Sequence, residues 1–133
     1  MESQKSIIMT SFNNHLFEFI DDIQSLFIND VAIDTTKNAL LIIKKTNPRM
    51  LITMWHSYIA LPYESNIEND DIDFFINKDY KEDLGNVSYQ NEIIKHIDRL
   101  REPIRNMGKD NQQKSLLYIK NLTKLSKIYT TTN

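Results

Sequence analysis

Residues 10–28 read TSFNNHLFEFIDDIQSLFI, and this stretch shows most directly which kind of fold the chain adopts. Its large apolar side chains recur every three or four residues, which is the spacing of one helix face. They are Phe12, Leu16, Phe19, Ile20, Ile23 and Phe27. Because Phe17 and Leu26 widen this stripe, the sequence predicts a largely buried helix over 10–28, with Thr10 or Ser11 as its N-cap.

The same periodicity continues beyond this stretch. Further helices are expected over 34–45, 48–60 and, as a short one, 70–77. Asp34 or Thr35 is the expected N-cap of the first of these, and Asn47 that of the second, which should end before Pro62. Trp55 lies on the apolar side of its helix, where a core anchor is favoured over an interface hot spot.

The segment 63–86 is ambiguous because apolar and acidic residues are mixed in it. The pattern favours the short helix followed by a polar loop that ends near Gly85. A β-hairpin stays open as the alternative, although no Asn-Gly or Asp-Gly turn supports it.

The end of the chain is expected to form an antiparallel hairpin of two long helices, 88–107 and 110–129. Gly108 separates the two apolar stripes. Pro103 lies inside the first stripe and should kink or divide that helix, because proline lacks the N–H that a helix interior uses. Residues 130–133 are expected to be a frayed tail.

Length and composition agree with one helical domain. The 133 residues fit a single domain, and only 2 glycines and 3 prolines interrupt them. The sequence therefore predicts an all-α fold over 1–133. It would be a compact bundle of five to six helices with a long C-terminal antiparallel helical hairpin over 88–129.

Composition also excludes several classes of protein. There is no cysteine, so no disulfide framework, cysteine-ligated metal or thiol nucleophile is available. The longest apolar run, 39–43, is far shorter than the roughly 20 residues of a membrane span, and the N-terminus lacks a signal-peptide core. No glycine-rich phosphate-binding motif occurs. We expect no cofactor, no metal, no small-molecule substrate, no membrane association and no secretion.

Catalytic chemistry has little support in the sequence. The three histidines, His15, His56 and His96, have no partner at the spacing of a metal motif. Asp71 and Asp73 begin like a calcium loop, but the required glycine is missing, so an acidic loop or partner-facing patch is favoured. No catalytic residue is assigned. A hydrolase built on scattered acids and histidines would need an imidazole within hydrogen-bonding reach of a carboxylate.

Charge is distributed unevenly along the chain. Residues 1–84 hold 7 Lys+Arg and 14 Asp+Glu, whereas residues 85–133 hold 9 and 4, which gives the net charge of -2. The candidate contact residues for a partner or for phosphates are the hairpin cations Arg99, Arg101, Arg105, Lys120, Lys124 and Lys127. The alternative is that these cations pair with the acidic N-terminal part of the same fold.

Several stretches of the chain resemble a family of small helical proteins, without an assigned activity, of nucleocytoplasmic large DNA viruses that infect algae, amoebae and other protists. The stretches are the apolar pattern of 12–23, KKTNPRM at 44–50, FFINKDY at 74–80, IDRLREPI at 97–104 and NLTKLS at 121–126. The resemblance implies a viral source and a setting in the host cytoplasm or virus factory, with packaging in virions as a further expectation. It supplies no catalytic residues.

These observations together favour a non-enzymatic interaction or structural protein of a large DNA virus. It would be a virion component or an accessory subunit of a viral assembly, with a protein partner or a second copy of itself. The alternative is a nucleic-acid-binding factor that uses the basic face of the C-terminal hairpin for phosphates.

Overall fold

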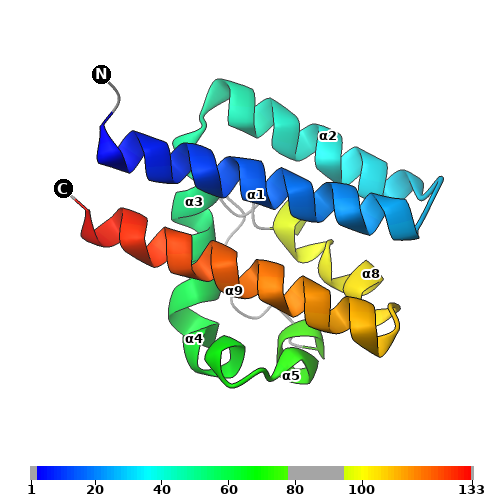
Figure 1. Ribbon diagram of the computed structural model, residues 1–133. Helices are drawn as coiled ribbons and strands as arrows, with labels where there is room; N and C mark the ends of the chain where they lie inside the picture. The colour runs from blue at the N-terminus through cyan, green and yellow to red at the C-terminus, as the bar shows by residue number, and fades with distance from the viewer. Residues whose placement is uncertain (1–2, 78–94, 133) are drawn as a thin grey trace.

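The computed structural model describes residues 3–77 and 95–132, and all regular structure in them is helical (Figure 1). The elements are α1 (Gln4–Leu26), α2 (Val31–Thr46), α3 (Arg49–Trp55), the π-helical segment η1 (His56–Ala60), α4 (Leu61–Glu68), α5 (Ile72–Asn77), α8 (Arg101–Arg105) and α9 (Lys109–Thr131). The predicted all-α fold is confirmed. The described part of the ambiguous segment, 63–77, is helical rather than a β-hairpin, and 78–86 lies outside the described residues.

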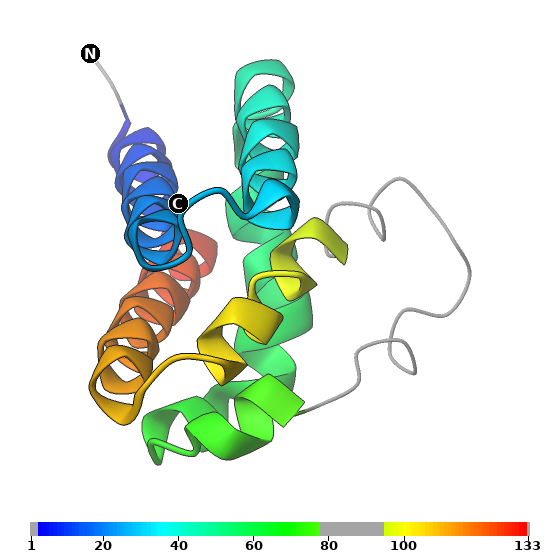
Figure 2. The same cartoon turned by 90° about the vertical axis from the view of Figure 1, so that its right-hand side faces the viewer.

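The longest helices, α1 and α9, lie side by side and antiparallel, so that both ends of the chain lie at the same end of the molecule (Figure 1). In the view of Figure 2, α1 and α9 form one layer, and α2, α3 and α4 form a second. The short helices α5 and α8 close the base of this arrangement. The C-terminal helix pair exists, but α9 packs most extensively on α1 rather than on α8.

The core lies between these layers and is built from the stripe that the sequence displays at its start. Phe12, Leu16 and Ile20 are fully buried. The ring of Trp55 meets that of Phe12 edge to face, with centroids 6.0 Å apart, and its indole N–H donates to the Thr123 hydroxyl at 3.1 Å. Trp55 is only 2 % exposed, which confirms it as a core anchor.

The first helix begins earlier than predicted. It starts at Gln4, and its N-cap is Ser3, whose hydroxyl accepts a hydrogen bond from the N–H of Ser6. Thr10 and Ser11, the predicted caps, lie inside the helix. The residues before Thr10 contain neither glycine nor proline, so nothing stops the helix from extending back to a serine that can cap it.

The second helix also begins earlier, at Val31. Its N-cap is Asp30, whose carboxylate accepts hydrogen bonds from the N–H groups of Ala32 and Ile33. The predicted caps Asp34 and Thr35 lie in the first turn and after it. An acidic residue in the first turn interacts favourably with the positive end of the helix dipole. Asp34 therefore stabilises the helix without capping it.

The third predicted helix, 48–60, does not end before Pro62. The helical run continues from α3 through the π-helical turns of η1 into α4 and ends at Glu68. Pro62 lies in the first turn of α4, directly after the π-helical turns, where a missing N–H costs little. At the other end, the predicted cap Asn47 is not the N-cap. The N-cap is Pro48, which makes no side-chain hydrogen bond.

The helix predicted over 88–107 is divided, as the proline suggested. Residues 95–98 are helical, a turn follows at 99–100, and α8 begins at Arg101. Residues 88–94 lie outside the described part. Pro103 lies in the first turn of α8, where its missing N–H has no helical acceptor to lose.

The last helix begins after Gly108, as expected, but it extends to Thr131, so the predicted tail of 130–133 starts later. Among residues 3–77 and 95–132, no helix combines the length and the apolar character needed to cross a membrane.

Candidate functional site

The structure separates the six candidate cations into two groups. Arg99, Arg101 and Arg105 lie on the segment that ends in α8, and Lys120, Lys124 and Lys127 lie on α9. The α8 arginines contact α5, whereas the α9 lysines lie opposite α4 and the turn after it. Most of these cations already have partners inside the fold.

Arg101 and Arg105 hold the end of α5. The Arg101 Nε–H donates to the carbonyl of Phe75 at 2.7 Å, and Arg105 donates to the carbonyl of Ile76. These carbonyls belong to the last turn of α5, where a helix has no N–H donors of its own for its carbonyl groups. The positive guanidinium groups also suit the negative end of the helix dipole. Two arginines spaced one turn apart on α8 thereby cap another helix.

Arg101 is unavailable to an external partner. Its side chain is 7 % exposed, and its Nη1 forms an ion pair with Asp98 at 2.7 Å. The guanidinium carbon lies 5.8 Å from the centre of the Phe75 ring. This burial corrects the prediction that places Arg101 on a contact surface, whereas Arg99 and Arg105 are exposed.

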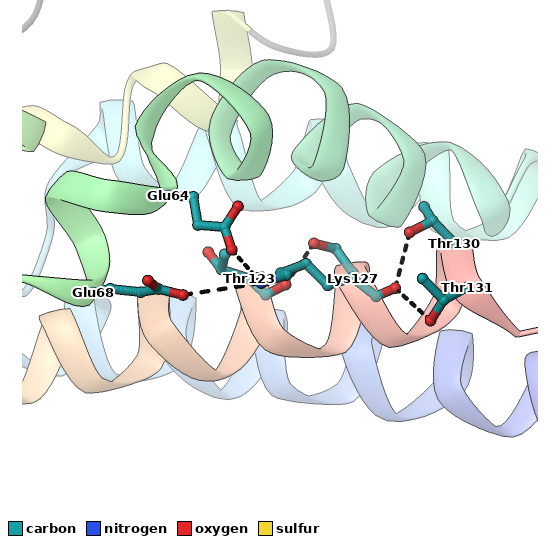
Figure 3. A network of polar contacts seen from close by, with 7 residues as sticks. Glu64, Glu68, Thr123, Lys127, Thr130 and Thr131 are labelled. Carbon is teal, nitrogen blue, oxygen red and sulfur yellow. Dashed lines mark hydrogen bonds and ion pairs between the residues drawn. The ribbon is translucent and has the colours of Figure 1, made fainter.

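The lysines of α9 face acidic residues of α4 and of the turn after it. Figure 3 shows Lys127 between Glu64 and Glu68, which are one helical turn apart on α4. Lys127 bonds to Glu64 and lies 3.9 Å from Glu68, and Lys120 pairs with Asp70. The basic face of α9 and the acidic face of α4 are therefore complementary within one chain. Such pairing is the structural alternative that the uneven charge distribution left open.

The Glu64–Lys127 pair favours the charged form of both groups. The hydrogen bond from Lys127 is the main reason that the pKa of Glu64 lies below its ordinary value, although partial loss of water opposes the shift. The same bond raises the pKa of Lys127. Both shifts are those of a structural ion pair, since a general acid or base would have its pKa moved toward neutrality.

Glu64→Gln should destabilise the protein slightly at neutral pH, and this difference from wild type should vanish at both ends of the pH scale. Because the folded pKa of Glu64 is lowered, its contribution is present above about pH 4.5 and is lost as the pH falls through the folded value. Because that of Lys127 is raised, its contribution is present below about pH 10.5 and is lost as the pH rises through the folded value. Urea midpoints measured across this range test both signs.

Glu18→Gln is the matched control, because Glu18 is exposed and has no lysine or arginine partner among the described residues. It should leave the urea midpoint at neutral pH close to that of wild type. Molar salt should shrink the Glu64→Gln effect, since exposed pairs are screened. An effect that persists unchanged at acid pH would contradict the assignment.

A groove of about 240 Å³ lies between α4 and α9. It is lined by Ile67, Glu68, Lys120, Thr123, Lys124 and Lys127. Two of its three lysines are neutralised by carboxylates, and Lys124 is exposed between them. This mixture of charges attracts anions only weakly, because phosphate would have to displace Asp70 and Glu64 from their lysines.

Two of the three histidines and the first residue of the acidic pattern make local contacts. His15 Nδ1 lies 3.6 Å from the exposed Glu18, and His96 shares a hydrogen bond with Arg99. Asp71, the first residue of the rejected calcium pattern, accepts a hydrogen bond from the N–H of Phe74 and so caps α5. No group of three histidine or acidic side chains converges as metal ligands in 3–77 and 95–132.

One surface was missed by the sequence analysis. Large apolar side chains are exposed on the outward side of α2 and in the loop before it: Ile28 (78 %), Val31 (75 %), Ile42 (63 %) and Leu41 (36 %). We name this set the α2 outer surface. The signal for it is the apolar run 39–43, which is too continuous for one helix face to bury. Leu40 and Ile43 point into the core, and Leu41 and Ile42 remain outside.

A scan against models of protein families and searches of curated proteins and of solved structures found no match for this chain.

Proposed function

We propose that this chain is a non-enzymatic protein that binds another protein through the α2 outer surface. The observation that carries the proposal is the exposure of Ile28, Val31 and Ile42 on one side of the bundle. Single exposed apolar residues are normal, and this set is proposed as an interaction site because three of its members are more than 60 % exposed. Val31 and Ile42 are three turns apart on the same face of α2, so a partner could contact both at once.

The proposed setting is a large DNA virus, with the chain as a virion component or as an accessory subunit of a viral assembly. The support for this setting is the sequence resemblance, which covers stretches from 12–23 to 121–126. In that setting the chain would act in the host cytoplasm, at the virus factory, or in the particle.

The α9 ion pairs favour a protein partner over the nucleic-acid alternative. A phosphate-binding face keeps its cations accessible to the backbone of the nucleic acid. Here Lys120 and Lys127 bond to carboxylates, and Arg101 is buried. Of the six candidate cations, Arg99, Arg105 and Lys124 are exposed, and Arg105 already donates to the carbonyl of Ile76.

The double variant Val31→Ser, Ile42→Ser tests the proposal. Tagged wild-type and variant chains would be purified from infected cells, and the co-isolated proteins quantified by mass spectrometry. We expect the amount of the specific partner that co-purifies with the variant to fall by at least about tenfold. Each of the two side chains would contribute about 1.5–3 kcal/mol when the partner buries it. Light scattering of the purified chain shows whether the partner is a second copy of the chain.

Leu61→Ser, Leu117→Ser is the matched control. These leucines are exposed to similar degrees, 63 % and 58 %, but they lie on α4 and α9. The control should keep the partner. If the α2 variant retains every partner that the control retains, the α2 outer surface is not the binding site and the proposal is wrong.

A further inference from the structure

A second hollow lies at the end of the molecule where α1 begins and α9 ends (Figure 1). Its volume is about 350 Å³, and it is lined by Ser3, Lys5, Ser6, Met9, Arg49 and Tyr129. These residues come from three separate elements, the start of α1, the start of α3 and the end of α9. Neither Lys5 nor Arg49 belongs to the basic hairpin that the sequence analysis selected.

Tyr129 positions both cations of this hollow. Its side chain is buried, at 4 % exposure, and the Lys5 ammonium lies 4.6 Å from the centre of its ring. Its phenol oxygen accepts a hydrogen bond from the Nε–H of Arg49 at 3.3 Å. Because that oxygen accepts from Arg49, the phenol O–H is left as a donor. A single rigid side chain therefore holds a guanidinium and an ammonium beside one hollow.

The charge balance of the hollow differs from that of the other cation sites. Lys37 pairs with Asp21 at 2.7 Å, Lys114 lies 3.4 Å from Asp22, and the α9 lysines pair with α4 and its turn. Lys5 and Arg49 form no ion pair with any carboxylate of the described residues. No carboxylate lines the hollow either. Two like charges brought together without a counter-ion repel each other, and a bound anion would relieve this repulsion.

The available donors match a phosphate group. Arg49 makes its one described bond through Nε, and its two Nη groups can donate to an anion. Lys5 adds three donors, and the phenol O–H and the Ser6 hydroxyl lie in the same lining. A guanidinium binds phosphate oxygens in pairs, and an ammonium adds a compact charge. The positive end of the α1 dipole contributes in the same direction.

We propose that Lys5, Arg49 and Tyr129 form a binding site for a phosphate group. Two sources supply a group of this chemistry. One is free phosphate or a phosphomonoester, and the other is the phosphate of a nucleic-acid backbone. The site shares no residue with the α2 outer surface, so its test is independent of the proposed protein partner.

Titration with inorganic phosphate, followed by amide NMR shifts at constant ionic strength, tests the site. We expect saturable shifts around Lys5, Arg49 and Tyr129. Arg49→Gln should raise the Kd for phosphate by at least about tenfold, because it removes a charge-assisted pair of donors. Lys45→Gln is the matched control, since it removes one exposed cation elsewhere and should leave the Kd unchanged.

Lys5→Gln provides a second variant with the same expected loss, should Arg49→Gln disturb the start of α3. Duplex DNA without terminal phosphates distinguishes the two sources. If it shifts the same signals and Arg49→Gln weakens this effect, the source is a nucleic-acid backbone. If only inorganic phosphate does so, the source is free phosphate or a monoester. Shifts that do not saturate, or equal affinity in Arg49→Gln and wild type, would overturn the proposal.

Discussion

Trp55→Ala lowers the free energy of unfolding by about 3–5 kcal/mol, which is the expected cost of removing a large buried aromatic side chain. Trp55 is 2 % exposed, and its ring meets that of Phe12 edge to face. Its loss also leaves the buried Thr123 hydroxyl without the donor that it now has. Since domains of this size are stable by about 5–15 kcal/mol, the variant should be close to unfolding. Urea denaturation followed by circular dichroism measures the effect.

Trp55→Phe separates packing from hydrogen bonding. It keeps most of the apolar volume but removes the indole N–H that bonds to Thr123. We expect an intermediate loss of about 1–3 kcal/mol, since a buried polar group loses its partner and the smaller ring leaves a cavity. A loss below about 1 kcal/mol for Trp55→Ala would contradict the placement of this side chain in the core.

Arg101→Met should lower the free energy of unfolding by about 2–4 kcal/mol. The change leaves the Asp98 carboxylate without its ion-pair partner and the Phe75 carbonyl without its donor. The expected loss of stability is below that for a fully buried ion pair, because the Asp98 side chain is 34 % exposed and water can replace part of the interaction. Thermal and urea unfolding of the purified variant measure the loss.

Two further variants test whether the stability depends on the position of Arg101 rather than on its charge alone. Arg99→Met removes the same charge from an exposed arginine two residues away and should cost less than about 0.5 kcal/mol. Arg101→Lys keeps the charge but lacks the planar fork that donates to Phe75 and to Asp98 at once, so it should only partly restore stability. Equal stability of Arg99→Met and Arg101→Met would refute the role given to Arg101 at the end of α5.

Local sequence signals predicted the helices well and their ends poorly. The stripe from Phe12 to Phe27 is periodic over about four turns, so its helix follows from the sequence alone. The ends depend on which of several polar residues provides the cap. The N-caps are Ser3 and Asp30 rather than Thr10 and Asp34, because the helices extend back beyond the predicted caps to these residues.

Pro62 shows that a helix end cannot be predicted from a single proline without its structural surroundings. Proline at this position predicts a helix end, and the rule holds for an ordinary α-helix. The π-helical turns from His56 to Ala60 change the hydrogen-bonding pattern just before it, so the helical run passes through. The local sequence holds no signal for these turns, whereas in the structure this region packs on α9, which is distant in the sequence.

The sequence by itself determined that the chain is helical, that its first stripe and Trp55 are buried, and that its cations gather near the C-terminal end. Only the tertiary structure decided which charges remain available. Lys120 and Lys127 bond to carboxylates of α4 and of the turn after it, and Arg101 is buried at α5. Lys5 and Arg49 meet at Tyr129 without an ion pair to any carboxylate of residues 3–77 and 95–132. The physical reason is the separation along the sequence. Helix periodicity is set by neighbours three or four residues apart, whereas the ion pair of Lys114 with Asp22 joins residues 92 positions apart.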